Sequence, residues 1–240
     1  MQIETVTQIH ESYKRLGPFE RVCVERWRAL NPSVRYQFLT DKDIDPWVKD
    51  QWPQHVDTYQ NMLPIARAGV QRLSSVLRWG GLYVDCGTYP IKPIDRFKPE
   101  GIWDRELAMF RLQDRPDEIP TITDCIFAAV KGHPFIRGLI GEIFRRTEDA
   151  SYASEDVRKF VFDTASVHVF SEYAYAQGVE GVRGLPDATH VDIDERKDEV
   201  NTMRYSTESW VPNNRFQRSG INRFDDEMGA LEVVKHHYGI

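Results

Sequence analysis

The segment from Arg67 to Asp85 constrains the fold of this chain more than any other. Apolar residues recur at helical spacing over 63–79, and the pattern stops at Gly80-Gly81, as helices commonly do at glycine. Residues 82–85 follow as a short apolar strand that ends in the carboxylate of Asp85. This order of elements is typical of an α/β sheet, in which ligands bind beyond the carboxyl ends of the strands.

The rest of the chain alternates strands and helices without an internal repeat or an obvious linker. A strand is predicted over 3–10, a helix over 19–30, and a half-buried strand over 34–38. The further predicted elements are strands at 106–112 and 123–130, a helix after Pro134, a helical pattern over 155–176 ended by Gly178, and short strands after 188 with 230–238 closing the sheet. We therefore expect the 240 residues to form a single α/β domain.

Composition narrows the class of protein. No run of eighteen apolar residues is present, so no membrane span is expected, and the N-terminus lacks the features of a secretory signal. The three cysteines, odd in number and widely spaced, indicate reduced thiols and a cytoplasmic location. A net charge of −6 weighs against a dedicated nucleic-acid binder, although the cluster of Arg215, Arg218 and Arg223 is either a local polyanion contact or a solvated loop.

The acid and the arginines of the 67–85 segment suit one kind of ligand. A carboxylate at the end of a strand can hold a divalent cation, and arginine can hold a phosphate with two parallel hydrogen bonds. A nucleotide diphosphate leaving group needs both, because negative charge grows on its phosphates as the bond to the transferred group breaks.

The segment resembles the DXD-containing sugar transferases that include the fungal initiating mannosyltransferase and bacterial capsule-polysaccharide transferases, and more distantly the large glucosylating toxins. Their pattern reads Arg-Ala-Asp-x-x-Arg, then Tyr-Gly-Gly-x-Tyr-x-Asp-x-Asp, then Pro-x-Lys-Pro-x-Asp. The positions in step here are Arg67, Ala68, Arg72, Gly80, Gly81, Tyr83, Asp85, Pro90, Lys92, Pro93 and Asp95. Weaker matches occur at 9–13, 27–32, 39–41, 131–134, 164–166 and 236–238, so the resemblance covers nearly the whole chain.

The resemblance implies a Rossmann-like GT-A glycosyltransferase fold, with a mixed central sheet flanked by helices. It implies that residues 1–130 hold a nucleotide-sugar donor, a UDP- or GDP-sugar, and that 131–240 form the acceptor side. It further implies transfer with retention of anomeric configuration, and manganese or magnesium as the cofactor.

Specific residues take roles from the matched positions. Asp85 and Asp124 are the predicted catalytic residues, and Asp85 and His237 are the predicted metal ligands, with His236 as the alternative if the register is off by one. The predicted donor-binding residues are Tyr13, Arg67, Arg72, Tyr83 and Asp85. Tyr13 either stacks on the base or belongs to the core, and Tyr83 either contacts the donor or packs in the sheet. Asp124 either contacts sugar or acceptor hydroxyls or helps to hold the cation.

Two departures from the pattern concern the donor pocket. Gly87 replaces the second acid of the DXD pair, and Gly69 replaces the acid expected after Ala68. Glycine inside a helix costs about 1 kcal/mol relative to alanine, so Gly69 is expected to make room for a donor group or for a neighbouring backbone. Without the acid at 69, Arg72 is expected to be freer to reach phosphate than to pair internally.

Three readings follow: a transferase with a cation at Asp85, a transferase that relies on Arg67 and Arg72 with little metal, and an inactive module that binds a nucleotide sugar or a partner. The acceptor is not encoded in any motif. A glycan is favoured, and a lipid-linked sugar, a protein side chain and a modified DNA base are the alternatives. The loop over 201–226 is the predicted acceptor contact or lid, and the oligomeric state is not indicated.

Overall fold

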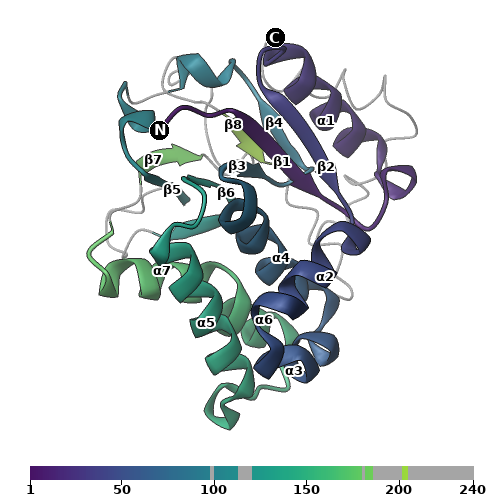
Figure 1. Ribbon diagram of the computed structural model, residues 1–240, viewed down its shortest axis with the longest axis vertical. Coiled ribbons are helices and arrows are strands. Elements are labelled where there is room, and N and C mark those ends of the chain that lie inside the picture. Colours follow the sequence, from purple (N-terminus) through teal and green to yellow (C-terminus); the bar gives the residue numbers. More distant parts are fainter. Residues whose placement is uncertain (98–99, 113–120, 180–181, 186–201, 205–240) are drawn as a thin grey trace.

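A computed structural model describes residues 1–97, 100–112, 121–179, 182–185 and 202–204 of the chain (Figure 1). Its centre is a six-stranded sheet with the strand order β2-β1-β3-β6-β5-β7. These strands are β1 (Thr5–Ile9), β2 (Arg35–Leu39), β3 (Gly81–Val84), β5 (Leu107–Leu112), β6 (Ile122–Ala129) and β7 (Val182–Leu185).

The sheet is mixed, and this places several chain segments at one edge. Strand β1 pairs in parallel with β2 and β3, whereas β6 runs antiparallel to both β3 and β5. The carboxyl ends of β1, β2 and β3 therefore meet the beginning of β6 along the same edge of the sheet. Strand β7 pairs in parallel with β5.

A second, two-stranded sheet lies beside α1 (Pro18–Leu30). It pairs β4 (Thr88–Pro90) with β8 (Thr202–Arg204) in antiparallel fashion, with Thr88 opposite Arg204. The indole of Trp27 on α1 donates a 2.8 Å hydrogen bond to the carbonyl of Thr88. Neither strand was expected at these positions as a separate pair. The predicted strand over 230–238 lies outside the described residues.

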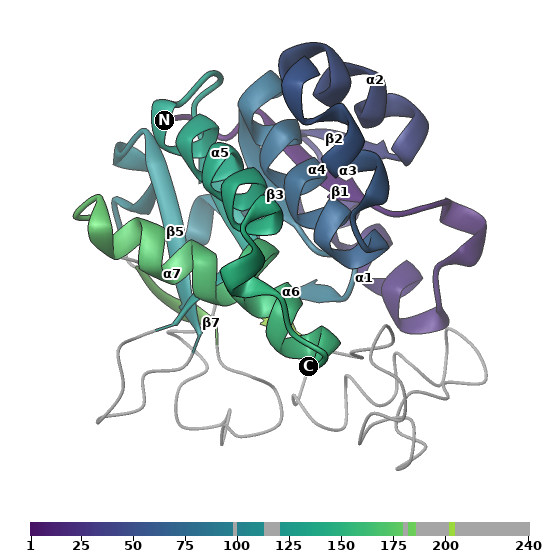
Figure 2. The same ribbon diagram turned by 90° about the horizontal axis from the view of Figure 1, so that it is seen from below.

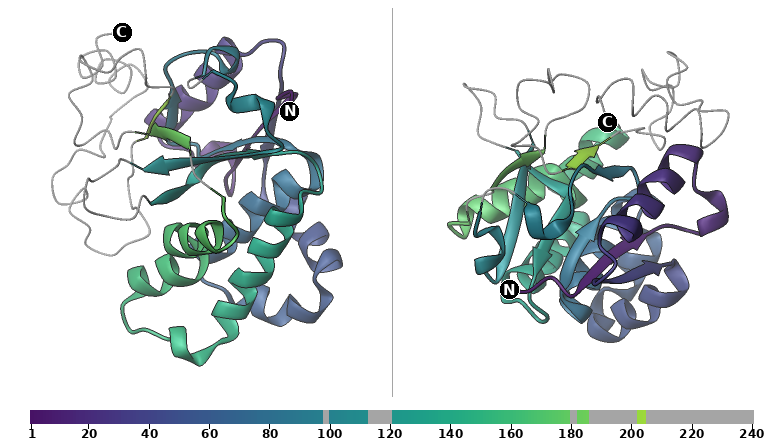
Figure 3. Two further views of the ribbon diagram at one scale, coloured as in Figure 1. Left: turned by 90° about the vertical axis from the view of Figure 1, so that its left-hand side faces the viewer. Right: turned by 90° about the horizontal axis from the view of Figure 1, so that it is seen from above.

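Helices cover both faces of the central sheet, as Figures 2 and 3 show. Helix α1 lies on one face and the other helices lie on the opposite face. Those other helices are α2 (Asp41–Gln51), α3 (Val56–Asn61), α4 (Pro64–Trp79), α5 (Pro134–Glu148), α6 (Val157–Ala165) and α7 (Val167–Ala176). The predicted α/β fold with a mixed sheet and flanking helices is confirmed.

Alternating side chains of the strands fill two cores. Phe127 and Ala129 of β6 pack with Tyr83 of β3 against the helices on one face. Ile126 and Ala128 point to the other face and pack with α1. All eight residues of β6 are buried, which agrees with its place inside the sheet.

Helices α2 and α3 were not expected, and the predicted helical pattern over 155–176 forms the two helices α6 and α7. The N-cap residue of helix α2 is Thr40, whose backbone N–H donates a 2.8 Å hydrogen bond to the carboxylate of Asp43. This Thr-x-x-Asp spacing is a helix-start signal that was present in the sequence. Helices α6 and α7 meet at Ser166.

The diglycine turn after α4 is a steric requirement. Gly80 and Gly81 have φ angles of 72° and 94°, in the left-handed region that glycine enters at little cost. A Cβ atom on Gly81 would also lie 2.4 Å from the carbonyl oxygen of Thr5 on β1. The predicted tight turn is confirmed, and it brings β3 directly against β1.

Gly69 allows close packing of two helices. It is buried in the middle of α4, and a Cβ atom at this position would lie 2.4 Å from the carbonyl oxygen of Ala165, the last residue of α6. Of the two alternatives for this glycine, the structure shows the neighbouring backbone. A side chain of any kind at position 69 would push α6 away from α4.

Substitution Gly69→Ala should therefore destabilise the protein despite the better helix propensity of alanine. Overpacking costs about 1–3 kcal/mol and the propensity gain returns about 1 kcal/mol, so the net loss lies within about 0–2 kcal/mol. We expect a value near the upper end, about 2 kcal/mol in the free energy of unfolding measured in urea, because the 2.4 Å contact is with backbone. Gly141 on α5 is the control, because no atom lies within 4 Å of its added Cβ. Gly141→Ala should gain about 0.5–1 kcal/mol. A Gly69→Ala variant as stable as Gly141→Ala would contradict the packing described here.

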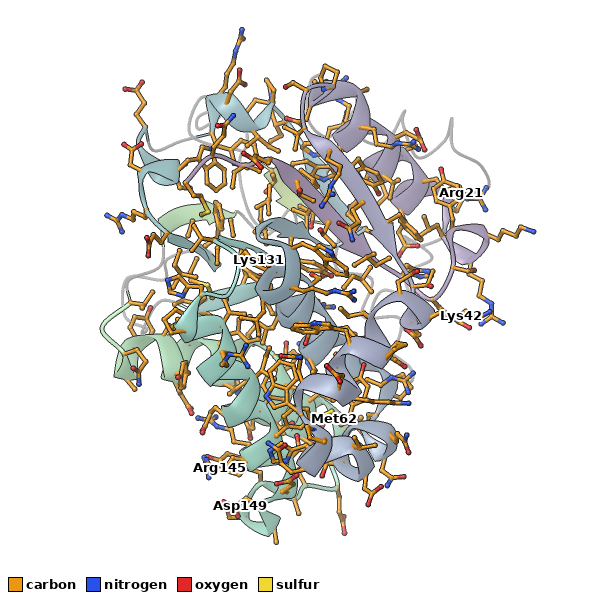
Figure 4. All side chains as sticks on the ribbon, in the orientation of Figure 1. Arg21, Lys42, Met62, Lys131, Arg145 and Asp149 are labelled. Carbon is orange, nitrogen blue, oxygen red and sulfur yellow. The ribbon has the colours of Figure 1, made fainter. Side chains whose placement is uncertain are left out.

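Arg146 of α5 links three helices, because it also binds residues of α6 and α7. Its side chain is buried, and its Nε and Nη2 atoms lie 2.7 Å from carboxylate oxygens of Glu142 and Glu172. Its Nη1 atom donates a 2.9 Å hydrogen bond to the carbonyl of Asp163. Arg145, labelled in Figure 4, lies on the exposed side and also binds Glu142, at 2.7 Å.

This network predicts an acid-sensitive part of the stability. The hydrogen bond from Arg145 lowers the pKa of Glu142 from 4.5 to about 2, with burial acting against it and Arg146 acting with it. A depressed pKa in the folded state stabilises the protein above the unfolded value, and this stabilisation is lost as the pH falls from about 4.5 through about 2. Glu142→Gln should flatten the pH dependence of the unfolding free energy in this window, measured by urea titration. The exposed Glu155→Gln should leave it as in the wild type.

Candidate active site

Asp85 and Asp124 lie side by side at the edge where the strands meet. Asp85 is the first residue after β3 and Asp124 is near the beginning of the antiparallel β6. The backbone N–H of Asp85 donates a 2.8 Å hydrogen bond to the carbonyl of Cys125, which fixes the two segments against each other. The two predicted catalytic residues are thus neighbours through the register of the sheet.

Arg72 of α4 lies between these two acids. Its Nη1 atom is 2.7 Å from Oδ2 of Asp124, and its Nε atom is 3.4 Å from Oδ1 of Asp85. The side chains are 12% exposed for Arg72, 15% for Asp85 and 6% for Asp124. The cluster is therefore largely out of water, and Asp85 is its most accessible member.

Burial and charge act in opposite directions on Arg72. Burial alone would lower the pKa of its guanidinium, but the carboxylates of Asp85 and Asp124, with Tyr83, raise it well above the ordinary value. Arg72 thus stays charged and pairs internally. The expectation that loss of the acid at position 69 would leave Arg72 freer is wrong, because Asp124 holds it.

Tyr83 packs in the sheet, which is one of the two roles that the sequence left open, and its hydroxyl binds Asp85. Its ring is buried and packs against Phe127, with the ring centroids 5.3 Å apart. Its hydroxyl donates a 2.7 Å hydrogen bond to Oδ1 of Asp85. Burial raises the pKa of this hydroxyl well above its usual value and the Asp85 carboxylate adds to the effect, so Tyr83 remains a hydrogen-bond donor.

Ser166 completes the cluster from the junction of α6 and α7. Its hydroxyl donates a 2.9 Å hydrogen bond to Oδ2 of Asp124, the same oxygen that binds Arg72. The thiol of Cys125 is 3.2 Å from the other oxygen of Asp124. Sequence reasoning placed 164–166 in a family motif but assigned Ser166 no role, since nothing local connects it to a residue 42 positions earlier.

Arg67 belongs to a separate network. Its Nη2 atom is 3.1 Å from Oδ2 of Asp41, and both side chains are partly exposed. The amide of Gln71 donates to Asp41 at 3.1 Å and to Asp45 at 2.8 Å. The two predicted phosphate-binding arginines are therefore held by different acids, and Asp41 and Gln71 are contacts that the sequence did not indicate.

Tyr13 lies after β1, on the same edge of the sheet. Its ring is 40% exposed and meets Phe38 edge-on, with the centroids 5.6 Å apart. Its hydroxyl donates a 2.7 Å hydrogen bond to Glu25. An exposed ring does not belong to the core, which leaves base stacking as the remaining prediction for Tyr13.

The described residues do not by themselves make a site for a divalent cation. Within these ranges no three His, Cys, Asp or Glu side chains gather as ligands. Asp85 is within reach of the positively charged Arg72 and already accepts a hydrogen bond from Tyr83. His236 and His237, the other predicted ligands, lie outside the described residues.

The arrangement suits a ligand rich in hydroxyl groups. Carboxylate oxygens accept and a guanidinium donates hydrogen bonds, so Asp85 and Arg72 together match the alternating needs of a sugar ring. Two acids against one arginine leave an excess of negative charge in this cluster. A diphosphate would therefore need a positive partner other than Arg72, and Arg67 is a partly exposed cation of α4.

No protein-family model matches the chain. The chain is 31% identical over 80 residues to mannosyl phosphorylinositol ceramide synthase CSH1 of Saccharomyces cerevisiae, which covers 32% of this chain and 21% of that protein. It is 27% identical over 169 residues to the initiation-specific alpha-1,6-mannosyltransferase of Schizosaccharomyces pombe, which covers 62% of this chain and 42% of that protein. The chain is distantly homologous to fungal mannosyltransferases. It spans less than half the length of either relative.

Among solved structures, the chain is similar to the PaToxG glycosyltransferase, with a TM-score of 0.48 and 12% identity over 73% of this chain and 69% of that one.

None of the helices in the described part of the chain is both long and apolar enough to pass through a membrane.

The buried pair predicts a large cost for removing its anchor. Asp124→Asn leaves the Arg72 charge buried with only the longer contact to Asp85, and breaking a buried pair in this way costs about 3–5 kcal/mol. We expect a loss of about 3 kcal/mol in the free energy of unfolding, near the lower limit because Asp85 remains. Glu11→Gln, which breaks the exposed pair with Arg15, is the control and should change little. Equal effects of the two substitutions would refute the buried character of the Arg72 cluster.

Proposed function

We propose that the chain is a GT-A glycosyltransferase that moves a sugar from a nucleotide diphosphate donor to an acceptor, with retention of configuration. The observation that carries the proposal is Arg72 held between Asp85 and Asp124 at the carboxyl edge of the sheet. That edge is where α/β folds bind nucleotides. The distant homology to fungal mannosyltransferases supports it, and mannose is accordingly the first sugar to test.

In this proposal the described residues bind and orient the donor. Asp85 accepts hydrogen bonds from sugar hydroxyls, and Arg72 donates to them while Tyr83 holds the carboxylate in place. Arg67 contacts the diphosphate and Tyr13 stacks on the base, a UDP or GDP base being the two candidates. The bond from the sugar to the diphosphate breaks, a bond to the acceptor oxygen forms, and the leaving diphosphate takes the acceptor proton. Positioning and electrostatics are then the work of the protein.

The two parts of the chain share this task. We assign donor binding to residues 1–130 and acceptor binding to 131–240, with a glycan as the favoured acceptor and a modified DNA base as the alternative. The competing function is an inactive module on the same fold, which Gly69 and Gly87 keep open. The contact of Gly69 with Ala165 gives this glycine a role in packing, so Gly69 is weak support for the inactive module.

Donor binding and hydrolysis test the proposal. Calorimetric titration with UDP and GDP, with and without manganese or magnesium, should show binding of one nucleotide, and the matching nucleotide sugar should be slowly hydrolysed. Asp85→Asn should lower hydrolysis at least about tenfold, since a hydrogen bond to a charged group contributes about 1.5–3 kcal/mol. Asp50→Asn, at an exposed position on α2, is the control.

The outcomes separate the readings. Binding that requires the metal, followed by hydrolysis, supports a cation at Asp85 whose further ligands lie outside the described residues. Metal-independent binding with hydrolysis supports an arginine-based site. Binding without hydrolysis supports the inactive module, and no binding of either nucleotide overturns the proposal.

A further inference from the structure

Two consecutive residues at the junction of α6 and α7 contact the surroundings of Arg72. Ala165 ends α6 and Val167 begins α7, and Ser166 lies between them as the end of one helix and the start of the other. The carbonyl of Ala165 lies against Gly69, and the hydroxyl of Ser166 binds Asp124. One short turn of chain therefore contacts both the helix that carries Arg72 and the acid that holds it.

The Ala165 contact excludes an acid from position 69. Even a methyl group there would overlap the Ala165 carbonyl oxygen, at 2.4 Å. Arg72, one helical turn further along α4, consequently takes its close carboxylate from Asp124 on β6, at 2.7 Å. The same junction thus contacts α4 at Gly69 and, through Ser166, the acid beside Arg72.

The two acids beside Arg72 differ in how firmly they are held. Asp124 is almost fully buried, and its Oδ2 atom binds both Arg72 and Ser166. Asp85 is more exposed and lies farther from the guanidinium, at 3.4 Å. Asp124 is therefore the anchor of Arg72, and Asp85 is the partner that is more open to solvent.

We propose that Ser166 is a positioning residue, which fixes the Asp124 carboxylate so that the Arg72 guanidinium is held in one orientation toward the donor sugar. This proposal rests on the proposed function for its effect on turnover. The orientation itself is a property of the protein without ligand. Without the Ser166 hydroxyl, the Asp124 carboxylate rotates more freely and Arg72 loses a fixed partner.

The substitutions Ser166→Ala and Ser166→Thr test the hydroxyl, which the first removes and the second keeps. Ser171→Ala is the control, because Ser171 lies within α7, the helix that begins after Ser166, and its hydroxyl binds the carbonyl of Val167 and the N–H of Ile122. Thermal unfolding of all three variants shows whether they are folded. Ser166→Ala is a gentler change than Asp124→Asn, because it removes one hydrogen bond to Asp124 and keeps both charges of the Asp124–Arg72 pair.

The first readout needs no donor. In the ligand-free protein, the Nη–H signals of Arg72 in a nitrogen-15 NMR spectrum, assigned by their loss in Arg72→Lys, should exchange slowly with solvent, because Nη1 binds Asp124. Ser166→Ala should speed this exchange about tenfold, consistent with the loss of one hydrogen bond to a charged group. Ser166→Thr and Ser171→Ala should leave it unchanged. An unchanged signal in Ser166→Ala overturns the positioning role, whatever the activity of the protein.

The second readout is hydrolysis of the nucleotide sugar that the wild type accepts. Ser166→Ala should lower kcat about tenfold with little change in the Kd of the free nucleotide diphosphate, because the nucleotide does not contact Arg72 in this proposal. Ser166→Thr should restore kcat. Equal losses in Ser166→Ala and Ser171→Ala would count as a general structural effect and overturn the proposal. A changed NMR signal in a protein that binds no nucleotide would uphold the positioning of Arg72 and defeat the proposed function.

Discussion

The buried charge of Arg72 is the constraint on which the site depends. A guanidinium removed from water is costly unless acids compensate it, and here the acids come from the end of β3 and the beginning of β6. The antiparallel pairing of β3 with β6 brings both acids to the same place, and the arginine comes from α4, which packs on one face of the sheet. Sheet register, helix packing and site electrostatics are thus one arrangement.

The packing of α6 against α4 at Gly69 is connected with the charges around Arg72. Because Gly69 has no side chain, the backbone of α6 packs directly against the backbone of α4. This approach brings Ser166 within hydrogen-bond distance of Asp124 on β6. Position 69 on α4 thus carries no acid, and the acid that pairs with Arg72 comes from the strand instead. The departure of this chain from the resembling pattern therefore has a physical explanation at position 69. The structure explains nothing about Gly87.

Local signals made much of this fold predictable. The helix, the diglycine turn and the strand ending in Asp85 follow from periodicity and from backbone angles that only glycine tolerates easily, and the structure has them at those positions. Helix α3 was missed because it is short and is stabilised by packing on distant helices, and helix α2 was missed although its Thr-x-x-Asp start signal was present. The partners of Arg72 were not predictable in full, since the Ser166 contact with Asp124 depends on how α6 and α7 join and leaves no mark on the spacing of residues.

The small sheet β4–β8 links the segment just after Asp85 to the chain at 202–204. Thr88, whose carbonyl also receives the Trp27 indole, is hydrogen-bonded to the backbone of Asp85 and paired in register with Arg204. Contacts between residues so distant in sequence form late, because closing a long loop costs chain entropy before any contact compensates it. During synthesis, the turn that carries Asp85 consequently stays without this support until residues 202–204 have been made.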